Sequence, residues 1–185
     1  RKALSTIEEL LESFPNNIDV LLEKSQIHFN MDDLIVAKSI LERVLTEDPN
    51  HYRASLLAMN LALKEKNYPL AREHFNVIKT VYPDGKEISQ LEGRILFKEG
   101  NIIKSINVFE KALEENKTQT TALHLANAYL ANGEQVKAAS LLNNWIKKHD
   151  DNAQVKFLLS SIYLEQQKPE QAISLLEELI AKYPK

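Results

Sequence analysis

The sequence predicts an all-α fold, a solenoid of helix-turn-helix repeats. Three prolines, Pro15, Pro49 and Pro83, lie 34 residues apart. A small residue keeps the same period, with spacings of 34, 34, 34, 33 and 34 residues, at Ala3, Ala37, Ala71, Ser105, Ala138 and Ala172. A repeat of this length is typical of solenoids, and no alternating β-branched pattern suggests a strand.

Each repeat contains two stretches in which apolar residues lie three or four positions apart, the spacing of an amphipathic helix. The second stretch of the fourth repeat, for example, has Val136, Ala139, Leu142, Trp145 and Ile146. We therefore expect eleven helices, at about 2–14, 18–31, 34–47, 51–66, 68–81, 86–99, 102–115, 119–132, 135–148, 153–166 and 169–182.

Turn and capping residues separate these helices. Three pairs suit turns or left-handed helix ends, namely Gly100-Asn101, Asn132-Gly133 and Asp84-Gly85. Asp32-Asp33 and Asp150-Asp151 are expected to cap the helices that follow them. The small residues of the second helices allow each helix pair to approach closely, and we expect them to face small residues on the first helices, at Ser25, Gly93, Ala126 and Ser160.

The period defines a single array over residues 1–185. We expect a leading half repeat at 1–17 and five repeats at 18–51, 52–85, 86–118, 119–152 and 153–185. The chain opens on Arg1 inside a repeat, so we expect it to be a piece of a longer protein.

Composition excludes several functions. The chain has no cysteine and a net charge of −3, which exclude thiolate chemistry and argue against nucleic acid as a partner. Its apolar runs are too short for membrane insertion. The five histidines are scattered, the four glycines form no phosphate loop, and the carboxylate pairs fall on solvated faces. We therefore expect no catalysis, no metal and no cofactor.

The repeats resemble the tetratricopeptide family, whose signature is W-x2-L-G-x2-Y, then A-x3-F, then P. The fourth repeat carries Leu125, Ala126 and Tyr129, followed by Ala138, Leu142 and Trp145. Repeats three and four have Lys117 and Asp150 in place of the closing proline. The resemblance implies a right-handed α-solenoid that serves as a non-catalytic scaffold for a protein or peptide partner.

The chain is also similar to the long bacterial tetratricopeptide lipoproteins of exopolysaccharide and exosortase (PEP-CTERM) systems. That similarity implies a location in the bacterial periplasm or at the outer membrane.

In this family the first helices line a concave groove that holds the ligand. The positions that correspond here are Leu22, Gln26, Phe29, Arg53, Leu56, Asn60, Leu63, Lys64, Gln90, Arg94, Phe97, Lys98, Leu123, Asn127, Leu130, Phe157, Ser161 and Leu164. They predict an apolar ladder with a basic centre, in which Glu87 is the main opposing charge. The family's clamp for a terminal carboxylate is not expected, because Leu22, Leu56, Leu123 and Phe157 occupy its usual lysine position.

Alternatives remain open at this point. The ladder residues could instead be half-buried between adjacent first helices. The array could be a self-assembly module that forms a homo-oligomer, or an accessory part of a larger enzyme or of a secretion or exopolysaccharide system.

Overall fold

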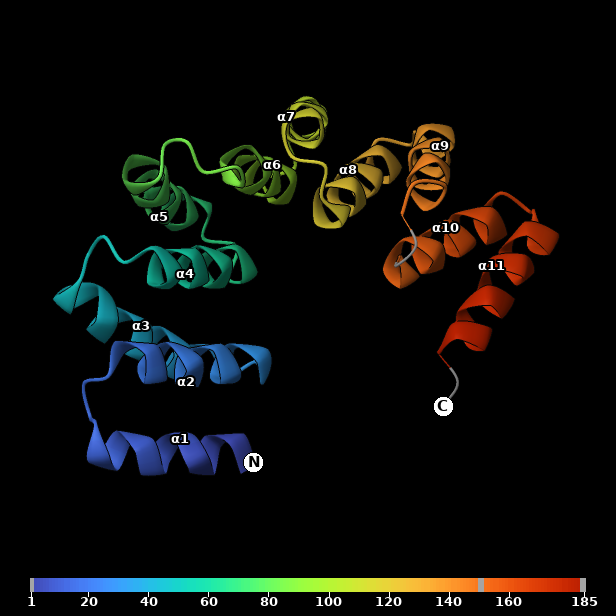
Figure 1. The fold of residues 1–185 in the computed structure, drawn as a ribbon. Coiled ribbons are helices and arrows are strands. Elements are labelled where there is room, and N and C mark those ends of the chain that lie inside the picture. Colours follow the sequence, from blue (N-terminus) through green and yellow to red (C-terminus); the bar gives the residue numbers. More distant parts are fainter. Residues whose placement is uncertain (1, 150–151, 184–185) are drawn as a thin grey trace. The chain divides into compact units, whose positions relative to one another are not determined.

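The structure, a computed structural model, describes residues 2–149 and 152–183, with side chains from Leu4 onward. The chain divides into two compact units, residues 1–88 and residues 89–185. The helices of the first unit are α1 (Lys2–Ser13), α2 (Ile18–Asn30), α3 (Leu34–Glu47), α4 (Tyr52–Lys64) and α5 (Tyr68–Val81) (Figure 1).

The second unit contains nearly all of α6 (Ile88–Lys98). It continues with α7 (Ile102–Glu115), α8 (Gln119–Ala131), α9 (Gln135–Ile146), α10 (Ala153–Glu165) and α11 (Pro169–Lys182). The described residues thus form eleven helices and no strand, and each predicted helix boundary lies within two residues of the observed one. The prediction of an all-α chain of helical hairpins is confirmed.

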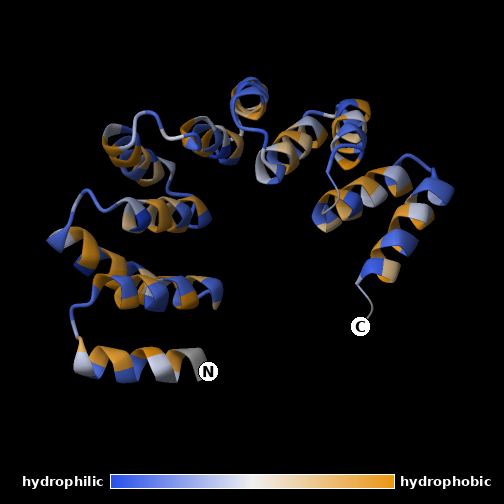
Figure 2. Ribbon diagram, in the orientation of Figure 1, coloured by the Kyte–Doolittle hydropathy of each residue, from blue (hydrophilic) through white to orange (hydrophobic). Residues whose placement is uncertain are grey.

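Apolar and polar residues are interspersed along the helices (Figure 2), and the apolar ones supply the buried core. The recurring small residue is fully buried in all five second helices, at Ala37, Ala71, Ser105, Ala138 and Ala172. In the first hairpin the Ser25 hydroxyl donates to the Ala37 carbonyl at 2.9 Å, as expected for facing residues. Close approach of the paired helices therefore rests on these small side chains.

One residue that was predicted to lie on the apolar face of α9, Val136, is not buried. Val136 is 78% exposed, whereas Ala139, Leu142 and Trp145 are buried. Val136 lies two residues before the buried Ala138, on the side of α9 that faces solvent, and Ile35 and Ile103 are exposed at the same repeat position. The buried stripe of the second helices therefore begins at the small residue.

A left-handed residue ends the first helix of every repeat. The residues with positive φ are Asp32, Lys66, Gly100, Gly133 and Gln167, which recur with the repeat period. In each case the N–H of the next residue donates to the carbonyl five positions earlier, as from Asn67 to Ala62 at 2.8 Å. This bond satisfies a helix-end carbonyl and turns the chain into the second helix.

The prediction that Asp32 and Asp33 cap the following helix is correct only for Asp33. Asp33 does cap α3, because its carboxylate accepts from the Val36 N–H. Asp32 instead takes the left-handed position, with φ of 66°. Asp150 and Asp151 lie outside the described residues. Gly85 is not left-handed; its N–H donates to the Tyr82 carbonyl at 3.0 Å in an ordinary turn.

We expect Lys66→Gly to stabilise the first unit by about 0.5–1 kcal/mol. Lys66 has φ of 59°, which crowds the Cβ of any L-residue, and glycine removes this strain at a smaller cost in chain entropy. The matched control is Glu65→Gly, since Glu65 has an ordinary φ of −75° and glycine there should only destabilise. Thermal unfolding followed by circular dichroism measures both variants, and equal destabilisation by the two would contradict the expectation.

Candidate binding surface

The surface formed by the first helices is here called the first-helix face, and that formed by the second helices the second-helix face. On the first-helix face of the first unit, α2 and α4 contact each other and enclose a hollow of about 110 Å³. The hollow is lined by Leu22, Gln26, Arg53, Leu56, Leu57 and Asn60. Five of these six residues are predicted groove residues, so the structure brings them together.

Burial removes two members of the predicted ladder. Leu22 is 2% exposed and Leu63 is 5% exposed, because both pack into the interior of the first unit. Gln26, Phe29, Leu56 and Asn60 are half-buried and reach the surface. In this unit the ladder is therefore largely a packing interface, with its accessible part at the hollow.

The charges of the first unit differ from the prediction. Arg53 pairs with Glu23 at 2.7 Å and with Asp19 at 3.4 Å. Lys64 pairs with Asp32 at 2.6 Å, and its Nζ lies 4.9 Å from the centre of the Phe29 ring. The predicted basic centre opposed mainly by Glu87 is thus wrong here, because α2 and its following turn already supply carboxylates to both cations.

Glu87 has a different role. It accepts a hydrogen bond from the Tyr52 hydroxyl at 2.7 Å. Burial, together with this neighbouring carboxylate, raises the pKa of Tyr52 above its ordinary value. The Tyr52 ring meets that of Tyr82 edge-on, with centroids 4.8 Å apart. Glu87 therefore belongs to a contact that ties the start of α4 to the chain after α5.

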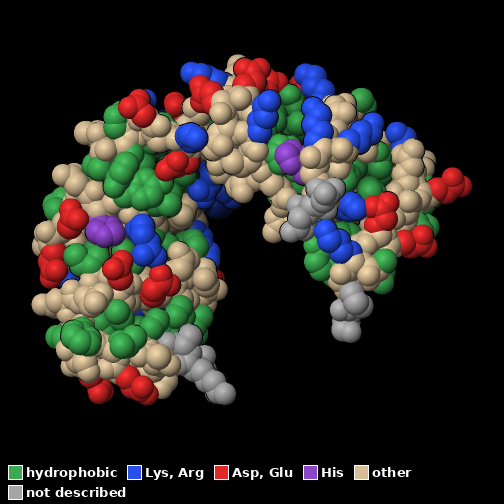
Figure 3. Space-filling view, in the orientation of Figure 1, with side chains coloured by type: hydrophobic (Ala, Val, Ile, Leu, Met, Phe, Trp, Pro, Cys, Tyr) green, Lys and Arg blue, Asp and Glu red, His purple; other side chains and the backbone are tan. Residues whose placement is uncertain are grey.

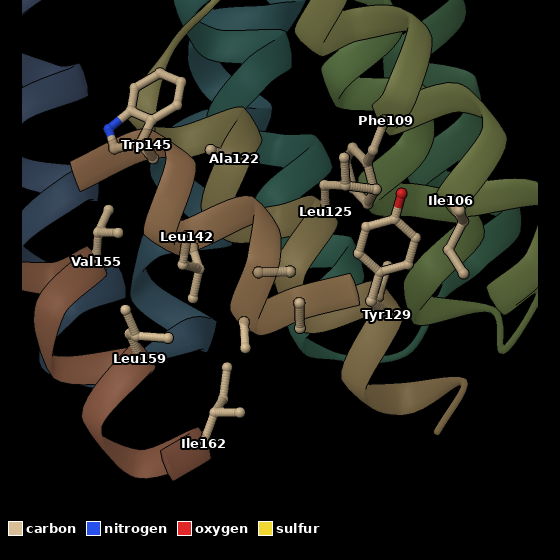
Figure 4. Close-up of a cluster of buried hydrophobic side chains, with 14 residues drawn as sticks. Ile106, Phe109, Ala122, Leu125, Tyr129, Leu142, Trp145, Val155, Leu159 and Ile162 are labelled. Carbon is tan, nitrogen blue, oxygen red and sulfur yellow. The ribbon is translucent and has the colours of Figure 1, made fainter. Parts of the chain in front are cut away.

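In the second unit the predicted residues of α6 and α8 lie on adjoining helices. Gln90 accepts a hydrogen bond from the Thr121 hydroxyl at 3.4 Å. Phe97, Leu123 and Leu130 are partly buried against the apolar cluster of this unit, drawn in Figure 4. Lys98 and Asn127 are exposed, while burial lowers the pKa of the Arg94 guanidinium.

A half-buried histidine, His124, lies beside these cations. The His124 ring stacks on Phe109, with centroids 5.5 Å apart. Burial, with smaller contributions from Arg94 and Lys98, lowers the pKa of His124 to about 4. The sequence did not single out His124, because the environment of this ring depends on residues of two other helices.

The last first helix, α10, is the most accessible part of the ladder. Phe157 is 63% exposed and Leu164 is 54% exposed. Ser161 lies between them and donates its hydroxyl to the Phe157 carbonyl at 3.1 Å. The predicted residues thus form one set on α2 and α4 in the first unit, and another on α6, α8 and α10 in the second.

Comparison with known proteins agrees with this geometry. Residues 32–95 match a family model described as "Tetratricopeptide repeat". Residues 98–179 match one described as "Anaphase-promoting complex, cyclosome, subunit 3". The chain belongs to the tetratricopeptide-repeat family.

Among curated relatives, the chain is similar to the TPR repeat-containing protein PA4667 of Pseudomonas aeruginosa. The two are 26% identical over 125 residues, which are 67% of this chain and 21% of that protein. The curated relatives it matches are much longer than the chain, which spans about a fifth to a third of their length.

Solved structures share the tetratricopeptide fold. A tetratricopeptide repeat protein from Parabacteroides merdae superimposes with a TM-score of 0.86 at 20% identity, covering 100% of this chain and 73% of that one. YrrB, described as a TPR protein with an unusual peptide-binding site, gives a TM-score of 0.56 at 15% identity, covering 96% of this chain and 92% of that one.

Sequence reasoning missed a pair of clefts on the second-helix face of these tetratricopeptide repeats. In the first unit a cleft of about 310 Å³ lies between α3 and α5, over α4. In the second unit a cleft of about 620 Å³ lies between α7 and α9, over Leu125 of α8. The two occupy equivalent places in the repeat. One feature of the sequence could have indicated the second cleft, because Trp145 and Lys117 in its lining depart from the repeat pattern.

Two further kinds of site are absent from the described tetratricopeptide residues. No three histidine, aspartate or glutamate side chains in residues 2–149 and 152–183 lie close enough together to hold a metal ion. Within the same residues, no helix combines the length and apolar character needed to cross a bilayer.

Proposed function

We propose that this chain is a non-catalytic protein-interaction scaffold that binds a peptide or helix of a partner on its first-helix face. The hollow between α2 and α4 is the observation that carries the proposal, because five predicted groove residues converge there. Its lining combines leucines with the side-chain amides of Gln26 and Asn60, which suits an apolar side chain with a polar backbone beside it. The family and the peptide-binding description of YrrB support the same class of partner.

The expected result of Leu56→Glu is loss of the partners captured by the wild-type chain. Leu56 lines the hollow, and a carboxylate there would both fill the hollow and repel an apolar side chain. Affinity capture followed by quantitative mass spectrometry measures the loss. Since Leu56 is half-buried, circular dichroism should first show that the variant remains folded.

A matched control is Ile35→Glu. Ile35 is exposed on the second-helix face of the same unit, so the same chemical change there should leave capture unaltered. Equal capture by the wild-type chain and both variants would reject the first-helix face as the binding surface.

Self-assembly is the second candidate function, and the exposed apolar residues of the last repeat favour it. Phe157 and Leu164 on α10 and Ile180 on α11 leave apolar surface in contact with water. Sedimentation over a dilution series tests this candidate, because a dimer that Ile180→Glu dissociates would support it. Membership of a larger enzyme or exopolysaccharide system, a bacterial lipoprotein origin and a periplasmic or outer-membrane location stay predictions.

A further inference from the structure

The cleft between α7 and α9 differs from its counterpart in the first unit. Both lie between consecutive second helices, so the repeat itself explains that a cleft exists. The first is lined by leucines, Ala58, His74 and a few polar residues of α3. The second has twice the volume, and it contains an indole and two lysines where the first has a single lysine, Lys38; each cleft has one imidazole. Its chemistry therefore comes from residues that break the repeat pattern.

Two departures from the repeat, Trp145 and Lys117, meet in this cleft. Trp145 is seven residues after the small residue of its helix, where the other full repeats have Val44, Ile78, Ala112 and Leu179. Lys117 occupies the position of the closing prolines Pro49 and Pro83. Lys148 follows the end of α9, as Lys117 follows the end of α7. Since consecutive second helices run in the same direction, both lysines lie at the same end of the cleft.

The floor of the cleft is apolar, and its walls combine apolar with charged side chains. Leu113, Leu125 and Leu141 line it, and the Trp145 indole stands at one edge of the buried cluster in Figure 4. From Glu110 to Lys117 the α7 wall extends for roughly 10 Å, at the helical rise per residue. An elongated apolar cleft of this length suits a short peptide segment with one or two large side chains.

The lysine end carries donors that lack acceptors. Among the described residues no carboxylate pairs with Lys117 or Lys148. The Trp145 N–H is buried and has no hydrogen-bond partner in the same part of the chain. The His149 ring stacks on the indole at 4.0 Å between centroids and is itself exposed. A lysine at a helix end is common by itself, but two lysines and an orphan N–H at an apolar cleft form a site for an anion.

The carboxylates of the cleft determine at which end such an anion can bind. Glu110 already accepts the Tyr129 hydroxyl at 2.6 Å, and Glu114 lies on the same α7 wall. Both would repel an acidic group from that wall. In Figure 3, blue lysine and arginine side chains border green hydrophobic surface over α7 and α9. A bound carboxylate therefore belongs at the end held by Lys117 and Lys148.

We propose that the cleft between α7 and α9 is a second docking site, which binds a partner peptide carrying a large apolar side chain next to a carboxylate. The apolar side chain lies on Leu113, Leu125 and Leu141, and the carboxylate lies between the ammonium groups of Lys117 and Lys148. This site is separate from the first-helix face, so its test does not depend on the function proposed above.

The test uses a phage-displayed library of random peptides, selected on the wild-type chain. Enriched peptides are expected to pair Leu, Ile, Phe or Trp with a neighbouring Asp or Glu. Their affinity is expected to fall roughly tenfold or more for the Lys117→Glu/Lys148→Glu variant, because two attractive contacts become repulsive. Replacing the acid of the peptide by its amide should weaken binding to the wild-type chain in the same direction.

A charge-matched control is Lys104→Glu/Lys147→Glu. Lys104 and Lys147 are exposed on the same two helix segments but do not line the cleft, so this variant should bind like the wild-type chain. Peptides that bind all three chains equally would overturn the proposal, as would a library that yields no acidic-apolar sequence. Peptides lost only by Leu56→Glu would assign binding to the first-helix face and also overturn it.

The Trp145 indole in the lining of the cleft can report peptide binding directly. Trp145 is the sole tryptophan of the sequence, so an NMR spectrum of the ¹⁵N-labelled chain has one indole N–H signal. That signal should move when an acidic-apolar peptide is added, and should move less with the amide peptide at the same concentration. If the wild-type chain alone dimerises and Lys117→Glu/Lys148→Glu abolishes the dimer, the occupant is a second copy and the peptide proposal is wrong.

Discussion

Replacing Phe109 by alanine is expected to destabilise the second unit by about 3–5 kcal/mol, the usual cost of deleting a buried aromatic ring. Phe109 is 1% exposed and belongs to the cluster shared by α7, α8, α9 and α10 in Figure 4. Its ring also stacks on His124. Urea unfolding followed by the fluorescence of Trp145 measures this unit directly, since both residues belong to it.

A substitution at Gly93 tests the packing of the Phe109 ring more specifically. A Cβ at Gly93 would lie 2.5 Å from Cε1 of Phe109, closer than two carbons can pack. Gly93→Ala should therefore destabilise the unit, because overpacking costs about 1–3 kcal/mol and exceeds the roughly 1 kcal/mol gained in helix propensity. In the Phe109→Ala background the clash disappears, and Gly93→Ala should become stabilising.

The control for this double-mutant cycle is Glu92→Ala, on the neighbouring residue of α6. Its effect should be the same in the wild-type chain and in the Phe109→Ala background. The effect of Gly93→Ala should differ between them, because the three atoms nearest to a Cβ at Gly93 all belong to the Phe109 ring. A Gly93→Ala substitution that destabilises both backgrounds equally would show that the ring does not set the need for glycine.

Most of the fold was accessible from the sequence because each repeat carries its own local signals. Apolar spacing predicted the helices, and the recurring small residue located the close crossing of each pair. Gly100 and Gly133 indicated left-handed turns, but Lys66 and Gln167 adopt the same conformation without a glycine to signal it. At these two positions the geometry of the repeat outweighs the preference of lysine and glutamine for negative φ.

The binding surface was less accessible because it depends on contacts between repeats. Arg53 looks like an available cation in the sequence, yet its carboxylate partner Glu23 is 30 residues away on α2. Leu22 and Leu56 occupy equivalent repeat positions, but only Leu22 is fully buried. The second-helix clefts required the spacing between helices, which no periodicity in the sequence encodes.

The second large effect is a loss of stability of the second unit on acidification from about pH 6.5 to about pH 4. The pKa of His124 falls to about 4 because the ring is buried next to Arg94 and Lys98. The ordinary value, 6.5, applies to the unfolded chain, which therefore binds the proton first as pH falls. The stability that the second unit owes to a neutral His124 is fully present above about pH 6.5 and is lost progressively down to about pH 4. This loss in the free energy of unfolding is at most about 3 kcal/mol, and contact of the ring with solvent reduces it further.

His124→Phe isolates this effect, because phenylalanine preserves a ring against Phe109 and cannot be protonated. The free energy of unfolding, measured by urea titration at several pH values, should fall more steeply for the wild-type chain than for His124→Phe. Every other titratable group is present in both chains, so the difference between the two curves is assigned to His124. Parallel curves for the wild-type chain and His124→Phe would mean that the imidazole meets water freely in the folded state, and that the contact with Phe109 does not exclude it.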